Sequence, residues 1–463
     1  YKVQPFKKGP DFIDPLWLGA AAGRTCRNLD FYLMQNDTIL QVFDQASAGA
    51  DIAVIEGNMG LFDSIDLEGN YSTASLARLL QKPVLLVVDA TKMTRGVAPL
   101  LLGYMNFEKD LTIAGVILNK VAGARHEDKL RNAIEHYTGL IVVGAIPKHE
   151  AMMLPERHLG LMPSVENEKS DSLIDRMADC LDEYVDFSKV IRIAGIAPSE
   201  VRTAFPVFIE TKTEAIATVA IATDNAFSFY YPDNLEALQK VGFSLVTFSP
   251  LHDQTVPDAD ALYIGGGFPE LFAEQLSGNE RMIHSIRQFA GSGRPVYAEC
   301  GGLMYLSSYI TANHQTYPLC SVLPFGSIMT DRPQGRGYVL AEIVNNKESL
   351  WSLPEGESVR AHEFHFSRAE NFSDQNFVFN IRKGFGITGK KDGYCSGNIL
   401  ASYLHIHAAS SPWWAESFME AVRRFKEQQL KIINKNSNVY NMISLQREEA
   451  VVSEKKDVLA GTS

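Results

Sequence analysis

Short apolar runs alternate with polar loops and helical stretches over the first 150 residues. Runs rich in β-branched residues predict buried strands at residues 51–55, 83–88, 113–118 and 141–146. Continuous apolar runs of this length are typical of parallel strands that are covered on both faces. Residues 72–80 and 127–137 between them have helical periodicity. The first half is therefore predicted to be a doubly wound α/β domain.

A second α/β pattern begins near residue 216. It predicts strands at residues 218–222, 244–248, 261–264 and 295–298, a helix at 234–241 and a closing helix at 415–430. Beyond residue 330 the pattern predicts more irregular β structure, with a last strand near 400–404. The domain expectation is residues 1–190 for the first domain, 191–215 for a linker, 216–432 for a second doubly wound α/β domain and 433–463 for a polar tail.

Composition narrows the classes of function. The chain has 463 residues and a formal net charge of -12, which argues against a protein that binds the phosphate backbone of nucleic acid. No apolar run reaches the ~18 residues that a membrane span needs. The five cysteines are widely spaced and form no C-x-x-C pair, so neither a disulfide framework nor a zinc knuckle is expected. A reducing cytoplasmic location is the expectation.

Cys300 is a candidate nucleophile. It follows the predicted strand at 295–298 and precedes Gly301, Gly302 and an apolar stretch expected to be a helix at 303–310. A nucleophile on a sharp strand-to-helix turn needs small neighbours, because the turn is crowded. The start of the helix directs N–H groups at the sulfur and stabilises a thiolate. The alternative is a buried structural cysteine, which is less compatible with this Glu-Cys-Gly-Gly setting.

Two further elements fit the same chemistry. Gly265, Gly266 and Gly267 follow the predicted strand at 261–264, so their backbone N–H groups are candidates for an oxyanion hole. His405 and His407 lie near the end of the last predicted strand, and their i, i+2 spacing places them on one side. We expect His405 to be the base that activates Cys300, with His407 as the alternative.

These elements together resemble the class I glutamine amidotransferase domain. The resemblance implies that a thiolate at Cys300 attacks the side-chain amide of glutamine, with His405 as base, to give a thioester, glutamate and ammonia. Two positions depart from the family pattern. Ala298 stands where many members have glycine, and His407 stands where the triad has glutamate. The branch of cobyrinic and cobyric acid synthases commonly lacks that glutamate, so the second departure indicates a branch.

The run at residues 3–15, Val-Gln-Pro-Phe-Lys-Lys-Gly-Pro-Asp-Phe-Ile-Asp-Pro, carries the chemistry of the first half. Lys7 places positive charge beside a Gly-Pro turn, and two carboxylates follow at Asp11 and Asp14. Glu56 ends another predicted strand before glycines, where α/β sheets bind ligands. Oxygen ligands of this kind are those that Mg²⁺ prefers, so a phosphate and Mg²⁺ site is the functional interpretation. A solvated loop is the alternative.

The ordered set of motifs resembles the cobyrinic acid a,c-diamide synthase family over nearly the whole chain. It comprises the run at 3–15 and the segments at 55–63, 72–77, 88–90, 118–120, 222–231, 362–367 and 401–405. The resemblance implies a P-loop, dethiobiotin-synthetase-like domain that uses ATP to phosphorylate the a and c acetate carboxylates of a corrinoid. Ammonia from the amidotransferase domain then displaces phosphate. It also implies purine contacts at Asn119 and Lys120, substrate or ATP contacts at Lys7, Asp11 and Asp14, and metal contacts at Glu56 and Asp11.

One departure concerns the nucleotide site. No G-x-x-x-x-G-K-[ST] sequence occurs in the chain, whereas the family has this P-loop upstream of the run at 3–15. The expectation is a segment missing before Tyr1. Residues 457–463 resemble the strand that enters such a loop, by coincidence or because the gene is rearranged. Two alternatives stay open: the same reaction on nickel sirohydrochlorin or hydrogenobyrinic acid, and a binding protein without a working ATP site.

Overall fold

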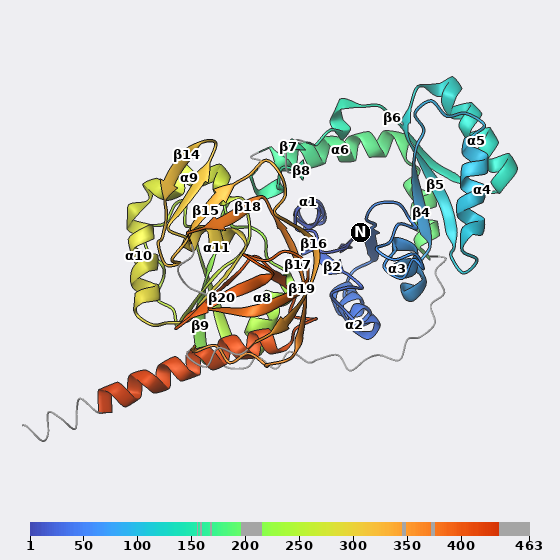
Figure 1. Ribbon diagram of the computed structural model, residues 1–463. Helices are drawn as coiled ribbons and strands as arrows, with labels where there is room; N and C mark the ends of the chain where they lie inside the picture. Colours follow the sequence, from blue (N-terminus) through green and yellow to red (C-terminus); the bar gives the residue numbers. More distant parts are fainter. Residues whose placement is uncertain are drawn as a thin grey trace, which may run out of the picture.

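The computed structural model describes residues 1–154, 156–157, 160–166, 169–195, 215–344, 349–371 and 376–434. It consists of two α/β halves that meet along one face (Figure 1). The first half is blue to green in Figure 1, and the second contains the yellow to red elements. This arrangement confirms the α/β fold class predicted from the sequence.

The first half contains two parallel sheets of three strands. The first has the order β2-β1-β3 and the second the order β4-β5-β6. The strands are β1 (Val3–Lys8), β2 (Arg27–Leu29), β3 (Ile52–Glu56), β4 (Val84–Asp89), β5 (Ile113–Val121) and β6 (Val142–Pro147). The helices are α1 (Ile13–Ala22), α2 (Asn36–Ser47), α3 (Thr73–Leu80), α4 (Val97–Phe107), α5 (Ala124–Thr138), α6 (Ser170–Tyr184) and α7 (Phe187–Gly195). Short elements follow β6: η1 (Glu150–Met152), β7 (Glu156–Arg157), β8 (Gly160–Leu161) and η2 (Ser164–Glu166).

Helix α3 connects the two sheets of the first half. Its Ala74 packs with the core of β4, β5 and β6, whereas Leu76 and Leu80 pack with the core around β1 and β2. Among the described strands, β3 and β4 each pair on one side only. Val54 and Val87 on these strands are 48% and 60% exposed, high values for valines in a parallel sheet. The sequence pattern predicted β3, β4, β5 and β6, but it gave no range for β1 or β2 and did not show this division into two sheets.

The second half is built on one ten-stranded sheet. Its order is β10-β9-β11-β12-β21-β20-β19-β16-β17-β22, parallel from β10 to β21 and antiparallel beyond. Two hydrophobic clusters pack on this sheet. The strands are β9 (Ala217–Ala222), β10 (Phe243–Phe248), β11 (Ala261–Ile264), β12 (Val296–Glu299), β16 (Gly335–Ile343), β17 (Ser358–His365), β19 (Phe377–Lys383), β20 (Lys391–Ser396), β21 (Ile399–Ser402) and β22 (His405–Ile406).

The remaining elements of the second half cover this sheet. A smaller sheet has the order β14-β13-β15-β18. Its strands are β13 (Tyr309–Ala312), β14 (Gln315–Pro318), β15 (Gly326–Met329) and β18 (Ser367–Glu370). The helices are α8 (Pro232–Lys240), η3 (Pro269–Phe272), α9 (Ala273–Gly278), α10 (Glu280–Gly291), α11 (Gly301–Leu306) and a last helix over residues 413–434. The helix predicted at 303–310 is shorter than expected, because the chain enters β13 at Tyr309.

Buried polar contacts join the two halves. The hydroxyl of Tyr231 donates to the carbonyl oxygen of Pro10 over 2.8 Å. Asp30, which is 1% exposed, accepts a hydrogen bond from Tyr338 over 2.5 Å. Arg27 forms ion pairs with Asp233, at 3.5 Å, and with Glu236. Buried polar contacts across an interface help to fix the relative position of the two halves.

The predicted linker and tail lie largely outside the described residues. Helix α7 ends at Gly195, so residues 191–195 are helical where a linker was expected. Residues 196–214 of the linker and 435–463 of the tail lie outside the description. No described helix is long and apolar enough to cross a membrane. All five cysteines are buried and free.

Candidate active site

Cys300 occupies a strained turn between β12 and α11. Its φ of 47° and ψ of -100° lie where residues with a Cβ are rarely found. Its backbone N–H donates to the carbonyl oxygen of Ser402 over 2.7 Å, which anchors the turn to the neighbouring strand. A Cβ on Gly302 would lie 2.1 Å from the carbonyl oxygen of Ile264, so only glycine fits after this turn. Backbone strain of this kind is concentrated at functional sites.

The glycine loop after β11 lies directly against Cys300 and His405. A Cβ on Gly266 would lie 2.6 Å from Cε1 of His405, so the loop backbone touches the imidazole ring. A Cβ on Gly301 would lie 3.0 Å from the backbone nitrogen of Gly267. Gly265 accepts a hydrogen bond at its carbonyl oxygen from Gly302 over 3.0 Å. The predicted glycines are thus brought together around the cysteine turn.

His405 lies beside Cys300 in the interior of the second half. His405 is 2% exposed, and it lines the same cavity as Cys300. Burial lowers the pKa of His405, but the interactions with Cys300 and then with Glu299 outweigh it and raise the pKa to about 10. A protonated imidazole next to the sulfur is the electrostatic setting that stabilises a thiolate.

His407 has different surroundings from His405. Its Nε2 lies 3.8 Å from Asp233 Oδ2, and its ring centroid is 4.6 Å from that of Tyr231. Burial lowers the pKa of His407, which leaves the ring neutral. It therefore faces the interface between the two halves, whereas His405 faces the sulfur.

Lys7 holds two carboxylates of the first half. Its Nζ lies 2.5 Å from Asp14 and 3.2 Å from Glu56, and it donates to the carbonyl oxygen of Gly57 over 3.3 Å. Burial lowers the pKa of Lys7, but Asp14 and Glu56 outweigh this effect and hold the pKa above its usual value. Burial also raises the pKa of Glu56, with partial opposition from Lys7. The ammonium group thus lies between Asp14, a predicted substrate or ATP contact, and Glu56, a predicted metal ligand.

Asp11 caps the first turn of α1. Its carboxylate accepts hydrogen bonds from the backbone N–H groups of Ile13, over 3.3 Å, and Asp14, over 2.9 Å. Burial and the charge of Asp14 raise the pKa of Asp11. The described residues contain no group of three His, Cys, Asp or Glu side chains arranged around one metal position. Any metal at this site would need ligands from a bound molecule as well.

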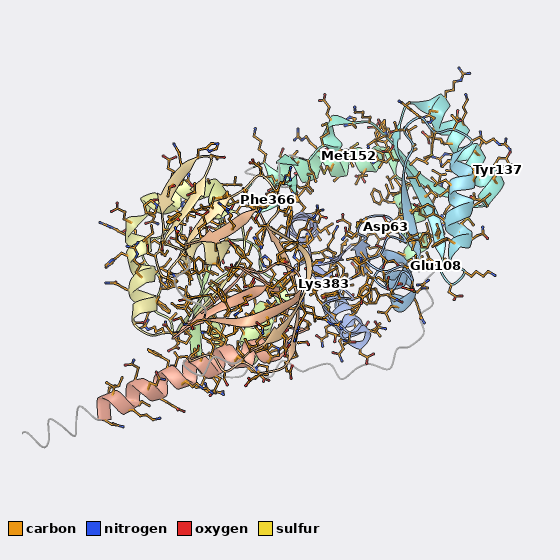
Figure 2. All side chains as sticks on the ribbon, viewed as in Figure 1. Asp63, Glu108, Tyr137, Met152, Phe366 and Lys383 are labelled. Carbon is orange, nitrogen blue, oxygen red and sulfur yellow. The ribbon has the colours of Figure 1, made fainter. Side chains whose placement is uncertain are left out.

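One cavity of about 360 Å³ connects residues of both halves. Phe366, which also lines it, is labelled in Figure 2 on the side of the second half that faces the first. The first half contributes Lys7, Asp11, Phe12, Ile13, Asp14, Asn58 and Leu161. The second half contributes Phe229, Gly267, Phe268, Glu270, Cys300, Met304, Met329, His362, Phe364, His365, Phe366 and His405. The candidate nucleophile and charged groups of the first half therefore line one cavity.

Asn119 and Lys120 lie elsewhere, at the end of β5. Lys120 has a φ of 59° and its Nζ forms an ion pair with Asp89 at 2.8 Å. The side-chain hydrogen bond from Lys120 lowers the pKa of Asp89. Neither Asn119 nor Lys120 lines the shared cavity. The predicted purine contacts thus lie outside the cavity that Lys7, Asp11 and Asp14 line.

No role was predicted from the sequence for Glu299, which directly precedes Cys300. The carboxylate of Glu299 is buried at the end of β12, with Oε2 3.6 Å from His405 Nδ1. A glutamate in an otherwise apolar strand, directly before the nucleophile, was the available signal. Its partner lies more than a hundred residues away in the chain, and only the pairing of β12 with β21 brings the two regions together.

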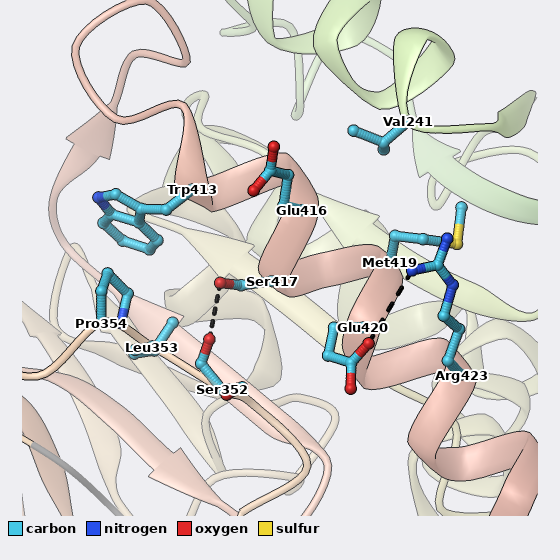
Figure 3. Close-up of a pocket in the computed structure, with 10 residues that line it drawn as sticks. All are labelled: Val241, Ser352, Leu353, Pro354, Trp413, Glu416, Ser417, Met419, Glu420 and Arg423. Atoms are coloured by element: carbon cyan, nitrogen blue, oxygen red, sulfur yellow. Dashed lines mark hydrogen bonds and ion pairs between the residues drawn. The ribbon is translucent and has the colours of Figure 1, made fainter.

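A second cavity, of about 630 Å³, lies beside the helix over residues 413–434 (Figure 3). Ser417 donates to the carbonyl oxygen of Ser352 across it over 2.8 Å, and Glu420 pairs with Arg423 at 4.0 Å. Trp413 and Leu353 supply an apolar side. None of its lining residues belongs to the cavity that contains Cys300.

The chain is similar to proteins of one known family. The CobB/CobQ-like glutamine amidotransferase domain matches residues 218–413, and an AAA domain matches residues 30–156. Cobyrinate a,c-diamide synthase of Magnetococcus marinus is 43% identical over 418 residues, which cover 89% of both chains. The enzyme of the same name from Methanothermobacter thermautotrophicus is 40% identical and covers 90% of this chain and 92% of its own. The chain belongs to the cobyrinate a,c-diamide synthase family. The resemblance predicted from the sequence is thereby confirmed.

Family membership fixes the enzyme class of the chain. It is a glutamine-dependent ligase, with an amidotransferase domain in the second half and an ATP-binding domain in the first. Among solved structures, PurLQS from Thermotoga maritima is similar with a TM-score of 0.34 and 16% identity, covering 47% of this chain and all of that one. The family assignment rests on the sequence relatives and the domain matches.

Proposed function

We propose that the chain converts the a and c acetate carboxylates of cobyrinic acid into amides in cobalamin biosynthesis, with ATP to activate each carboxylate and glutamine to supply the nitrogen. The relatives that support this substrate are named cobyrinate a,c-diamide synthase. The observation that carries the proposal is the single cavity lined by Cys300 and His405 from one half and by Lys7 and Asp14 from the other. A cytoplasmic location accompanies this assignment.

The amidotransferase half releases ammonia in this scheme. The thiolate of Cys300 attacks the side-chain amide carbon of glutamine, and the developing oxyanion accepts hydrogen bonds from backbone N–H groups of Gly267 and Gly301. Gly265 and Gly266 hold that loop against the turn. His405 gives its proton to the departing nitrogen, so that the C–N bond breaks and ammonia and a thioester form. Water then cleaves the thioester, His405 takes a proton from it, and glutamate leaves.

The first half activates the carboxylate. An oxygen of the corrinoid acetate attacks the γ-phosphorus of ATP, which gives an acyl phosphate and ADP. Ammonia then attacks the acyl carbon and phosphate leaves. Lys7 lines the shared cavity and is positively charged, so we assign it to the phosphate or the carboxylate, with Asp14 orienting it. Asn119 and Lys120 are assigned to the purine at the end of β5.

Mg²⁺ fits the carboxylate cluster beside Lys7. Asp14 and Glu56 both pair with the Lys7 ammonium group, and the pKa of Glu56 is raised by burial and by the charges of Asp14 and Asp11. A divalent cation with oxygen ligands neutralises such an excess of negative charge. We assign Glu56 and Asp11 as its protein ligands, with nucleotide phosphates completing the set. The ion would neutralise the charge that develops on the transferred phosphoryl group.

The test is amide formation on a defined corrinoid. The protein is incubated with ATP, Mg²⁺, cobyrinic acid and glutamine labelled with ¹⁵N in the side-chain amide, and the corrinoid is weighed by mass spectrometry. Two labelled amides on cobyrinic acid are expected. Parallel arms with hydrogenobyrinic acid and nickel sirohydrochlorin measure the competing substrates. A faster reaction in either arm, or no labelled product in any arm, would overturn the proposal.

A further inference from the structure

Glu299 is a buried carboxylate held in a fixed position beside the candidate base. Its side chain is 2% exposed, and two fully buried tyrosines orient it. Tyr297 donates to Oε1 over 2.7 Å, and Tyr263 donates to Oε2 over 3.3 Å. A carboxylate inside a protein is costly unless it is hydrogen-bonded and paired with a cation. The two tyrosines supply the hydrogen bonds, so a neighbouring cation must supply the compensating positive charge.

His405 is the cationic partner of Glu299. Among the described residues, Glu299 forms an ion pair with His405, with 3.6 Å between Oε2 and Nδ1. Nδ1 is buried and has no hydrogen-bond partner at shorter range. Catalytic hydrogen bonds are often long without substrate and shorten when it binds. With Nδ1 directed at Glu299, Nε2 is the ring nitrogen left to face the sulfur of Cys300.

His407 cannot orient His405 in the way that the triad glutamate does at its position. Its ring is neutral and carries no acceptor charge for Nδ1 of His405, and it faces Asp233 and Tyr231 instead. A carboxylate acting on His405 must therefore come from another part of the fold. Glu299 comes from the end of β12, one residue before the nucleophile.

We propose that Glu299 is the positioning residue of this active site, holding His405 through Nδ1 and replacing the carboxylate that the triad has two residues after the base. The proposal rests on the assignment of Cys300 and His405 above. Glu299 fixes the tautomer and the orientation of the His405 ring and stabilises its protonated form. The carboxylate of a catalytic triad acts on its histidine in the same way.

Three titratable groups face the His405 ring. Cys300 and Glu299 come from the β12 turn, and His362 comes from β17 with its ring centroid 6.3 Å away. Burial and the charge of His405 lower the pKa of His362 to about 3, so His362 is neutral and adds no charge near neutral pH. The ring of Phe12, 4.8 Å from that of His405, covers it from the first half. Glu299 is therefore the carboxylate whose removal changes the charge balance of the pair.

The test compares Glu299→Gln with the unaltered protein in two measurements against pH. The first is kcat/KM for glutamine hydrolysis, and the second is the rate at which iodoacetamide alkylates Cys300. Loss of the carboxylate makes the thiolate harder to form and the imidazolium easier to lose. The bell-shaped pH profile of hydrolysis should therefore narrow from both sides, and the onset of alkylation should move to higher pH. The rate at the optimum should fall by roughly 10²-fold, the scale seen when such an orienting carboxylate or outer hydrogen-bond partner is removed.

Glu363→Gln is the matched control. Glu363 is another fully buried carboxylate of the same sheet, 3.8 Å from His365, and it accepts hydrogen bonds from Phe385 and Gly386. The Glu363→Gln variant should have a lower melting temperature than the unaltered protein, with both pH profiles unchanged. If Glu299→Gln behaves in this way too, Glu299 is only structural and the proposal is wrong. If Glu299→Gln does not fold, Glu299→Asp takes its place, because the shorter side chain holds the carboxylate farther from His405. Its two pH profiles should change in the same direction as expected for Glu299→Gln, but by less. Unchanged profiles in Glu299→Asp would equally refute the proposal.

Different results would refute the assignment of the nucleophile and the role of Glu299. Absence of glutaminase activity and of Cys300 alkylation in the unaltered protein would refute the assignment of the nucleophile itself. An active unaltered protein with unchanged profiles in the Glu299 variants would refute only the role of Glu299.

Discussion

Lys7 and Cys300 come from different halves of the chain and line the same cavity. Lys7 is fixed by its ion pairs with Asp14 and Glu56, and Cys300 is fixed by the strained turn after β12. In the mechanism proposed above, ammonia formed at the sulfur crosses this cavity toward the charged groups of the first half.

Removal of the nucleophile should separate the two activities. In Cys300→Ala we expect glutamine-dependent amide formation to be lost, because no thioester can form, while amide formation with added ammonium salt is retained. The measurement is the corrinoid product with each nitrogen source, by mass spectrometry. Loss of both activities in a folded variant would show that Cys300 also serves carboxylate activation.

The two histidines give a direct comparison of roles. His405→Asn should slow glutamine hydrolysis by ~10² to 10⁴, the scale of a lost general base. His407→Asn should have a much smaller effect on this rate, because its ring faces Asp233 and Tyr231. Glutaminase assays of both variants, with circular dichroism to verify folding, decide the matter. A larger loss for His407→Asn would reverse the assignment of the base.

Lys7 should affect amide formation and not glutamine hydrolysis. Lys7→Gln is expected to lower amide formation by ~10² to 10³, as when one group that stabilises transition-state charge is removed. Glutamine hydrolysis should continue, since Cys300 and His405 are intact. The exposed Lys109 provides the control variant Lys109→Gln, which should change neither rate. Equal losses of hydrolysis and amide formation in Lys7→Gln would contradict the division between the halves.

Much of the fold follows from local sequence pattern. The strands predicted at 218–222, 244–248 and 261–264 correspond to β9, β10 and β11 within one or two residues. These are continuous apolar runs bounded by polar loops, so the local signal and the buried environment agree. The division of the first half into two sheets was not predictable, because periodicity identifies strands but not which strands pair.

The site was only partly visible in the sequence. Cys300 and the loop at 265–267 have local signatures, because a tight turn demands glycine at particular positions. The local signal for Glu299 is only its place before Cys300 in an apolar strand. The role proposed for it depends on Tyr263, Tyr297 and His405, which come from other strands or face it only after folding. Nor did the sequence show that Lys7 lies between Asp14 and Glu56. Contacts between distant segments are set by the tertiary fold alone.

Asp392 should make the stability of the protein depend on pH. It is fully buried, and Oδ1 accepts hydrogen bonds from Ser402 and Tyr403, whereas Oδ2 has no partner among the described atoms. Burial, with the charge of Glu363 adding to it, raises the pKa of Asp392 to about 7, against 3.8 as its ordinary value. The folded protein thus keeps a proton that the unfolded chain releases. The resulting stabilisation is complete below the ordinary pKa and is lost as the pH rises through about 7.

Asp392→Asn tests this dependence because asparagine keeps an acceptor oxygen and cannot ionise. Between about pH 5 and about pH 8 the melting temperature of the unaltered protein should fall more steeply than that of Asp392→Asn, since only the former must lose a proton from a buried site or remain protonated at a cost. Asp258→Asn is the control, because the Asp258 side chain is 98% exposed and its substitution should leave the slope unchanged. The measurement is thermal unfolding at a series of pH values in one ionic strength. Parallel curves for Asp392→Asn and the unaltered protein would mean that Asp392 is ionised in the folded state throughout this range, with its charge balanced by the hydrogen bonds to Oδ1.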